Sequence, residues 1–338
     1  MYKENAVATL RKAVIWIGTG AIIFILWRIR LAVLVALGAV LIAILLHLIA
    51  HLFRRTGAIS QNGSLVLAIV LVAAILLLCG WLFGSRVTSE FVQLGARLPQ
   101  GGRSLGTLVG LGAKNQVTRD VSLVAGMLPG LMFGSLRVFE YLIVTAIASI
   151  YLAAQPALYR DGIGALFPDA LRARTIAALN LVGVSLKLWM TGQSILMISV
   201  GILSFGAALL VGLPDPIALG LIAGISELVP YLGPFLGAIP AILVALTLGL
   251  APALWIAASY LVIHLFEGYL AGPLLQRWFV HIPPPLILVG IVACQQLFGI
   301  AGFILATPLT IIVHTAIKFF YQGVVLRQTV DVPTSAPF

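Results

Sequence analysis

The chain has 338 residues, of which 61% are hydrophobic and only 9% are charged, whereas an ordinary soluble domain carries about 25% charged residues. A mean hydropathy of +1.14 excludes a water-soluble globular domain, which needs a polar shell, and an intrinsically disordered chain, which needs low hydrophobicity. The net charge of +10 comes from basic residues that are scattered along the chain, which is typical of a membrane protein and not of a nucleic-acid reader. We therefore expect a polytopic membrane protein.

Three apolar runs near the N-terminus predict three membrane spans within residues 1–83. A hydrocarbon core of about 30 Å takes roughly 20 helical residues, and apolar runs of comparable length lie at 13–27, 31–53 and 64–83. A basic segment precedes the first run, as in a signal peptide, but no small-x-small cleavage site follows it. We therefore expect this first run to be retained as a short span.

The middle of the chain predicts a surface region followed by two further spans. Residues 84–136 are rich in glycine and carry several charges, which predicts amphipathic helices at or outside the membrane surface. Residues 137–191 combine a fourth span at about 137–158 with a polar connector, and a fifth span is predicted at about 192–213.

The next apolar segment is too short to cross a bilayer in one pass. Residues 216–229 would extend about 21 Å as a helix, and the run Pro230-Tyr231-Leu232-Gly233-Pro234 separates them from a second apolar half at 235–250. Because prolines and glycine interrupt helices, we expect a re-entrant hairpin with Pro230, Gly233 and Pro234 at its break. One long, proline-kinked helix is the alternative.

The same design returns near the C-terminus. After a full span at 252–275, an apolar half at 286–293 leads to a break at Gly299 and Gly302, and a second half covers 303–319. With the N-terminus inside, the two units of span plus broken hairpin have opposite topology, which is typical of inverted-repeat transporters.

The expected fold class is an all-α polytopic membrane protein with about eight membrane segments, in which two broken, re-entrant hairpins form an inverted repeat. The transport core would cover residues 192–320, and a C-terminal tail would cover 321–338. Lys and Arg in the short loops favour cytoplasmic N- and C-termini, although Arg28 and Arg30 then lie outside, against the positive-inside rule.

Three ionisable residues inside these apolar segments are candidates for ion coupling. Glu227 lies three residues before Pro230, and a carboxylate in an apolar run is usually functional or paired; the alternative is a protonated Glu that caps a backbone amide. His264 and Glu267 are three residues apart, hence on one helix face, and such a pair can exchange a proton near neutral pH. A snorkelling pair at the membrane interface is the alternative for these two.

Uncharged polar residues near the two breaks are candidates for binding a solute. Non-helical backbone cannot face lipid, so the breaks should meet inside the protein near the midplane. Ser226 and Tyr231 flank the first break, and Gln295 and Gln296 precede the second, where they could contact a small polar solute. Packing and helix–helix hydrogen bonds are the alternative roles.

Several chemistries find no support in the sequence. Cys79 and Cys294 lie far apart in apolar runs without ligand spacing. His47 and His51 have metal-like spacing but no acidic third ligand nearby in sequence. No nucleophile elbow or Walker loop occurs, so we expect no enzyme activity, cofactor, metal site or ATP-driven pumping.

The run from Glu227 to Pro240, ELVPYLGPFLGAIP, resembles the autoinducer-2 exporter family of bacterial membrane transporters. The Pro-Tyr-x-Gly-Pro box within it is the most specific mark of that family. The resemblance continues through EGYLAGP at 267–273, LFGIAGF at 297–303 and TPL at 307–309, and therefore covers most of the chain.

This resemblance implies a multi-pass protein of the bacterial inner membrane that exports small signalling molecules, as in quorum sensing. Some relatives are sodium or lithium/proton antiporters, and a homo-oligomer such as a pentamer is expected. The sequence departs from the family at Glu227, where members often carry Asn or another polar residue, and at His281 with the three prolines that follow it. The added carboxylate favours proton coupling.

The leading hypothesis is a secondary transporter that exports a small polar solute, such as an autoinducer-2-like molecule, coupled to protons or cations. A sodium (or lithium)/proton antiporter is one alternative. A non-transporting membrane scaffold or channel-like oligomer is another. The expected partners are the solute, H+ or Na+, membrane lipid and further copies of the chain, without nucleic acid.

Overall fold

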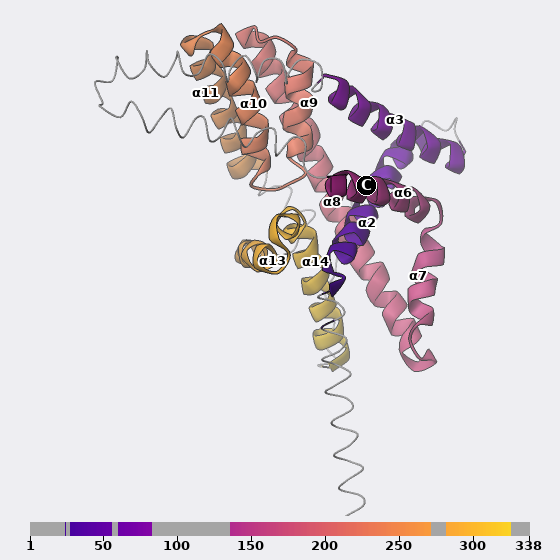
Figure 1. Ribbon diagram of the computed structural model, residues 1–338. Coiled ribbons are helices and arrows are strands. Elements are labelled where there is room, and N and C mark those ends of the chain that lie inside the picture. Colours follow the sequence, from indigo (N-terminus) through magenta and orange to yellow (C-terminus); the bar gives the residue numbers. More distant parts are fainter. Residues whose placement is uncertain (1–23, 25–27, 56–59, 83–135, 272–281, 326–338) are drawn as a thin grey trace, which may run out of the picture.

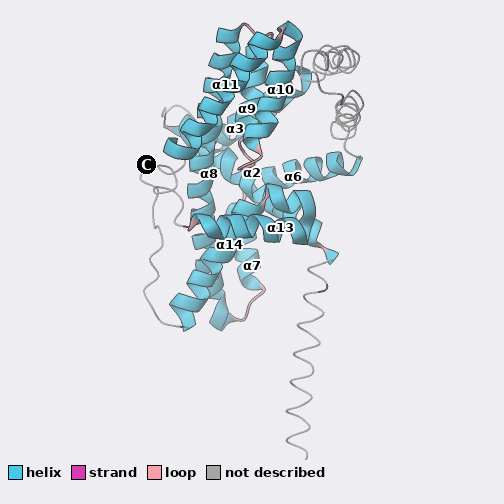
Figure 2. Cartoon of the chain, turned by 90° about the vertical axis from the view of Figure 1, so that its left-hand side faces the viewer, coloured by secondary structure: helices cyan, strands magenta, loops and turns pink. Residues whose placement is uncertain are grey.

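The protein is helical throughout the part of the chain that its structure, a computed structural model, describes: residues 24, 28–55, 60–82, 136–271 and 282–325 (Figures 1 and 2). Within these ranges, five helices are long and apolar enough to cross a membrane, or six if one bent pair is a single span. This confirms an all-α polytopic membrane protein. The count of eight segments and the inverted repeat stay predictions.

Two N-terminal helices match the predicted second and third spans. They are α2, Arg30–Arg54, and α3, Gln61–Leu82. Small residues such as Ala43, Ala68 and Ala153 form one of the buried clusters of this region, and small residues let membrane helices approach closely. The predicted first span at 13–27 lies almost wholly outside the described residues, and so does the predicted surface region at 84–136.

The fourth span ends earlier than predicted and turns sharply. Helix α6, Leu136–Ala154, is followed by α7, Pro156–Ala165, at an angle of 92°. Pro156 lacks the N–H that would continue the ladder of α6, but it suits the first turn of a new helix. The chain therefore bends at this point instead of continuing to residue 158.

Helix α8, Asp169–Val211, is much longer than the predicted fifth span. Its 43 residues extend about 64 Å, roughly twice the thickness of a hydrocarbon core. The second half of the predicted polar connector belongs to this helix, because no proline occurs between Pro168 and the end of the helix. Gly212, in the left-handed conformation with φ +77°, ends it.

The first broken segment is a helical hairpin. It consists of α9, Pro216–Ser226, and α10, Gly233–Leu248. A Cβ atom on Gly233 would lie 2.8 Å from Cα of Glu227, and one on Gly237 would lie 2.9 Å from Cα of Ala223. Later residues of α10 thus contact earlier residues of α9, so the two helices are antiparallel. The alternative of one kinked helix is therefore wrong for this segment.

Glycines also bring α9 against α8. A Cβ atom on Gly224 would lie 2.6 Å from the carbonyl oxygen of Met197, and one on Gly220 would lie 2.7 Å from that of Gly201. A larger side chain at either position would push the two helices apart. Around this contact, buried apolar residues of α8, α9, α10 and the following helix form one of the hydrophobic clusters of the protein.

That following helix is α11, Leu250–Phe266, which continues as a short π-helix, η2, Glu267–Ala271. Together they match most of the predicted span at 252–275, whose last residues lie outside the described ranges. Single π-helical turns are often found at functional sites.

The second broken segment also reverses direction. Helix α13, Pro284–Ile304, is interrupted at Gly299 (φ +68°, ψ −148°), and α14, Ala306–Ile317, follows it and continues as η3, Lys318–Val325. A Cβ atom on Gly302 would lie 2.9 Å from the carbonyl carbon of Cys294. Residues eight apart in a continuous helix are separated by about 12 Å along its axis, so the chain folds back at Gly299, as predicted.

The two breaks share one apolar cluster. Leu228 from the first break and Leu305 from the second both pack against a buried cluster built on Leu186, Trp189 and Ile311. The two hairpins therefore contact one apolar cluster, and the facing of polar residues between the two breaks stays a prediction.

Arg30, which is far from the second break in sequence, forms a hydrogen bond beside it. Its Nη1 donates a hydrogen bond of 2.9 Å to the carbonyl oxygen of Leu297, just before the break at Gly299. A cation suits the carbonyl end of a helix. This contact gives Arg30 a structural role that is independent of the positive-inside rule.

Candidate functional site

Helix α11 and η2 place three polar side chains along one face. Tyr260, His264 and Glu267 follow each other at steps of four and three residues, which is the spacing of a single helix stripe. Tyr260 is 2% exposed, while the side chains of His264 and Glu267 are 16% and 19% exposed. The Nδ1 of His264 lies 2.9 Å from Oε2 of Glu267, within hydrogen-bond distance.

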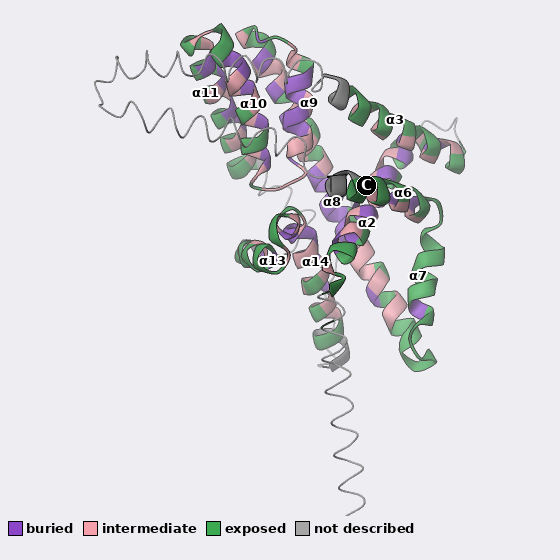
Figure 3. Cartoon of the chain, viewed as in Figure 1, coloured by how far each residue is buried: buried purple, intermediate pink, exposed green. Residues whose placement is uncertain are grey.

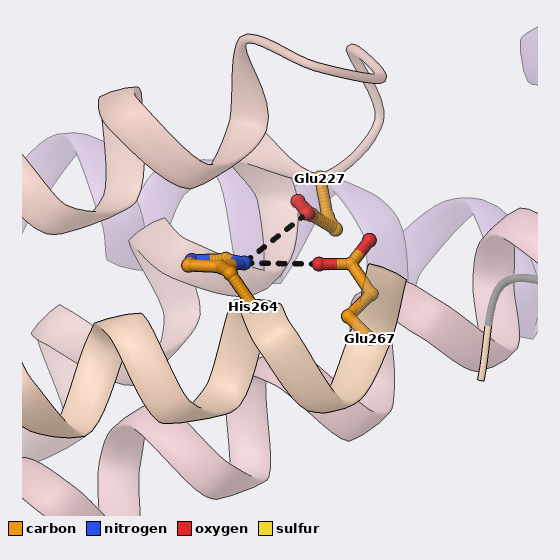
Figure 4. A group of neighbouring side chains, drawn as sticks. All are labelled: Glu227, His264 and Glu267. Carbon is orange, nitrogen blue, oxygen red and sulfur yellow. Dashed lines mark hydrogen bonds and ion pairs between the residues drawn. The ribbon is translucent and has the colours of Figure 1, made fainter. Parts of the chain in front are cut away.

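The first hairpin brings Glu227 to this pair. Glu227 follows the last residue of α9, its side chain is 2% exposed, and its Oε1 lies 4.0 Å from Nδ1 of His264 (Figure 4). All three residues offer a ligand atom within 4.8 Å of the others. In the sequence Glu227 lies 37 residues before His264 and 40 residues before Glu267. The structure brings the three residues into one group, here called the acidic triad.

The three side chains of the acidic triad are all shielded from solvent. Oε2 of Glu227 has no hydrogen-bond partner among the described residues, and the side chains of His264 and Glu267 are largely buried. The roles of these residues in ion coupling, and the alternatives of a capping Glu and a snorkelling pair, stay predictions.

The acidic triad needs a positive counterpart. Two carboxyl groups at this distance repel each other when both are ionised, and burial makes uncompensated charge costly. The imidazole can contribute at most one positive charge. Protons or a bound cation would have to supply the rest, which makes this group suitable for ion exchange.

Gln193 of α8 holds the first break in place. Its Nε2 donates a short hydrogen bond to the main-chain oxygen of Glu227, and its side chain is buried. The bond satisfies a carbonyl at the end of α9 that no helical N–H reaches. Gln193 is not among the site residues predicted from the sequence, although an amide inside an apolar helix is a visible signal.

Replacing Gln193 by Leu should lower the stability of the protein by about 1–3 kcal/mol, because it leaves a buried carbonyl oxygen without a donor. The change conserves volume approximately, so packing losses are small. The matched control is Gln155→Leu at an exposed residue that makes no side-chain cap bond. Thermal unfolding in detergent should show a lower midpoint for Gln193→Leu than for this control; equal midpoints would contradict the proposed support.

Two further buried polar residues lie on the helices around the acidic triad. The hydroxyl groups of Tyr260 and Ser204, like Nε2 of His264 and Oε2 of Glu227, have no hydrogen-bond partner within the described ranges. Ser204 is fully buried on α8. Unpaired buried polar atoms are rare in native proteins and call for an ion, a water molecule or a ligand.

The other four predicted polar residues lie on two different hairpins. Ser226 ends α9 beside Glu227 and is half-buried. Tyr231, in the break with φ +67°, is 49% exposed. Gln295 and Gln296 are exposed on α13, which lies beside α14 and apart from α9, α10 and α11 in Figure 1. The roles of these four residues in binding a solute stay predictions.

The comparisons with known proteins agree with a transport function. The sequence matches the family described as "AI-2E family transporter" over residues 13–322. It is 30% identical to "Putative transport protein YrrI" of Bacillus subtilis (strain 168) over 209 residues, which is 61% of this chain and 59% of the relative. It is 29% identical to "Putative transport protein YueF" of the same strain, over 47% of this chain and 42% of the relative.

A third relative, "Putative transport protein" of Thermotoga maritima, is 28% identical over 39% of this chain and 41% of the relative. The alignments thus span about half the length of these relatives. The family match, in contrast, covers most of the chain, including both hairpins and the acidic triad. This membrane protein with several apolar spans therefore belongs to the AI-2E transporter family.

Proposed function

We propose that the protein is a secondary transporter that exports a small polar solute, such as an autoinducer-2-like molecule, in exchange for protons or cations. The observation that carries this proposal is the acidic triad, in which a buried carboxyl group lies beside a His–Glu pair and has one oxygen without a hydrogen-bond partner among the described residues. It stands where a hairpin break meets a spanning helix. Membership in a transporter family supports transport, and not catalysis, as the function of the protein.

The coupling mechanism follows from the positions of the three residues. Glu227 lies on the first hairpin, whereas His264 and Glu267 lie on α11 and η2. Loading or releasing a proton or cation changes the attraction between these two elements. The break, where Tyr231 adopts a left-handed conformation, is the place where the hairpin can move in response. Ser226 and Tyr231, with Gln295 and Gln296 of the second hairpin, would contact the solute.

The proposal includes the membrane arrangement predicted from the sequence. The protein would lie in the bacterial inner membrane with about eight segments, an inverted repeat and cytoplasmic termini. Large apolar side chains are exposed along α3, α6 and α8, and the exposed residues of α3 are green in Figure 3. Lipid or neighbouring copies in a homo-oligomer, such as a pentamer, would cover these side chains.

A sodium (or lithium)/proton antiporter is the second candidate function. The observation that favours it is that the buried polar groups of the acidic triad are ionisable, while the uncharged Gln295 and Gln296 lie on another hairpin. A site of this kind suits a cation better than a neutral solute.

Proteoliposomes with a trapped pH-sensitive dye and an imposed pH gradient distinguish these functions. Proton movement that starts on adding a labelled polyol solute supports the exporter. Movement that starts on adding Na+ or Li+ without any organic solute supports the antiporter. A gradient that neither addition changes, in vesicles shown to contain the folded protein, supports a scaffold and overturns the proposal.

A further inference from the structure

We propose that the acidic triad binds a divalent first-row transition-metal ion, such as Zn2+ or Mn2+. The inference deepens the proposed function, because it names the class of cation that the coupling site takes. It goes beyond the expectation drawn from His47 and His51, which concerned another part of the chain.

The geometry of the donor atoms fits a small metal ion. Ligand distances of about 2.0–2.2 Å in zinc sites place tetrahedral ligand atoms about 3.3–3.6 Å apart. In the acidic triad, Nδ1 of His264 lies 2.9 Å from a carboxylate oxygen of Glu267 and 4.0 Å from one of Glu227. Shifts of less than about 1 Å would bring these three atoms around one ion.

An unpaired buried atom points to a missing ligand. Oε2 of Glu227 has no hydrogen-bond partner among the described residues, and the side chain is only 2% exposed. A Cβ atom on Gly233 would clash with this oxygen. Only glycine at position 233 therefore leaves space for Oε2 of Glu227. A bound cation would satisfy the carboxylate in the way that no described donor does.

The charge of the site favours a divalent ion. Two ionised carboxylates with a neutral imidazole carry two negative charges, which one divalent cation balances. Two uncharged neighbours lie close to the triad: Gln193, which binds the main-chain oxygen of Glu227, and Tyr260, whose ring centre lies 6.0 Å from that of His264. An imidazole ligand beside carboxylates suits Zn2+, Mn2+ or Fe2+, whereas Mg2+ and Ca2+ prefer oxygen ligands alone.

His264 can offer its Nδ1 to a metal ion. This nitrogen must be free of hydrogen to donate its lone pair to the metal, so the neutral ring would keep its single proton on Nε2. Three protein ligands leave a fourth position open, which is typical of sites that exchange their ligand.

The test is metal binding by the full chain in detergent, purified with a tag that contains no histidine and freed of metal by a chelator. Equilibrium dialysis against Zn2+ or Mn2+ should show one ion bound per chain, with weaker binding at lower pH. Glu227→Gln and His264→Gln should each weaken binding by more than about tenfold. His51→Ala, at an exposed histidine, should bind as the unchanged protein does.

Co2+ serves as a second probe, because its visible spectrum reports a nitrogen ligand that His264→Gln would remove. If a variant does not fold, as judged by gel filtration and thermal unfolding, Glu267→Gln takes its place. Binding that all the triad variants retain, or that only Na+ competes for, would overturn the inference. Metal binding without proton-coupled flux would contradict the proposed function alone, and flux without metal binding would contradict this inference alone.

Discussion

Replacing Glu227 by Gln should remove most of the pH dependence of transport. The amide keeps the shape of the side chain beside Gly233, but it can neither release a proton nor balance a cation at the acidic triad. Coupling free energies between linked sites are typically about 1–3 kcal/mol, or about 5- to 150-fold, so flux driven by a pH gradient should fall by a factor in this range. Proteoliposomes with a pH-sensitive dye measure it directly.

Glu140→Gln provides the matched control for this experiment. Glu140 lies on α6 with an exposed side chain, so the same chemical change there should leave flux unchanged. Glu227→Gln should also unfold at nearly the temperature of the unchanged protein, because the amide keeps the shape of this buried side chain. If pH-driven flux in Glu227→Gln equals that of the control, then Glu227 does not couple transport.

Local features that depend on chain composition could be predicted from the sequence. The first break follows from prolines and a glycine within five residues, and the second from two glycines in an apolar run. Glu227 was identified because a carboxylate is unusual between apolar residues, and the His264–Glu267 pair because their spacing places them on one face. Each of these signals lies within a few neighbouring residues.

The features that depend on packing between helices could not be predicted. The distance of 4.0 Å between His264 and Glu227 joins α11 to the end of α9, and α10 packs against both of these helices. The bond from Arg30 to the carbonyl oxygen of Leu297 joins residues 267 positions apart. The periodicity of the sequence shows which residues share one face of a helix, but it does not show which other helix packs against that face.

The expectation about Gln295 and Gln296 illustrates the same limit of sequence patterns. Both precede the second break and were expected to face the first. The two breaks do approach one cluster, yet Leu228 and Leu305 make that approach. The apolar cluster partly buries these leucines, whereas both amides are exposed on α13.

Replacing Gly302 by Ala should destabilise the protein by about 1–3 kcal/mol, which is the usual effect of overpacking. The added methyl group would lie 2.5 Å from Cβ of Phe298 and 2.9 Å from the carbonyl carbon of Cys294, so main chain as well as side chain would have to move. In a continuous helix the same change would instead stabilise by about 0.5–1 kcal/mol. The unfolding midpoint should therefore fall if the segment is a hairpin and rise if it is a continuous helix.

Gly183→Ala is the control, because nothing lies within 4 Å of a Cβ atom at that position of α8, and its unfolding midpoint should stay equal or rise. The hairpin also predicts a functional effect of Gly302→Ala. Leu305, three residues further on, packs against the cluster that receives Leu228, the residue next to Glu227. Displacing the second hairpin should therefore disturb the acidic triad and reduce proton-coupled flux. A variant that is as stable and as active as Gly183→Ala would show that α13 and α14 do not fold back at Gly299.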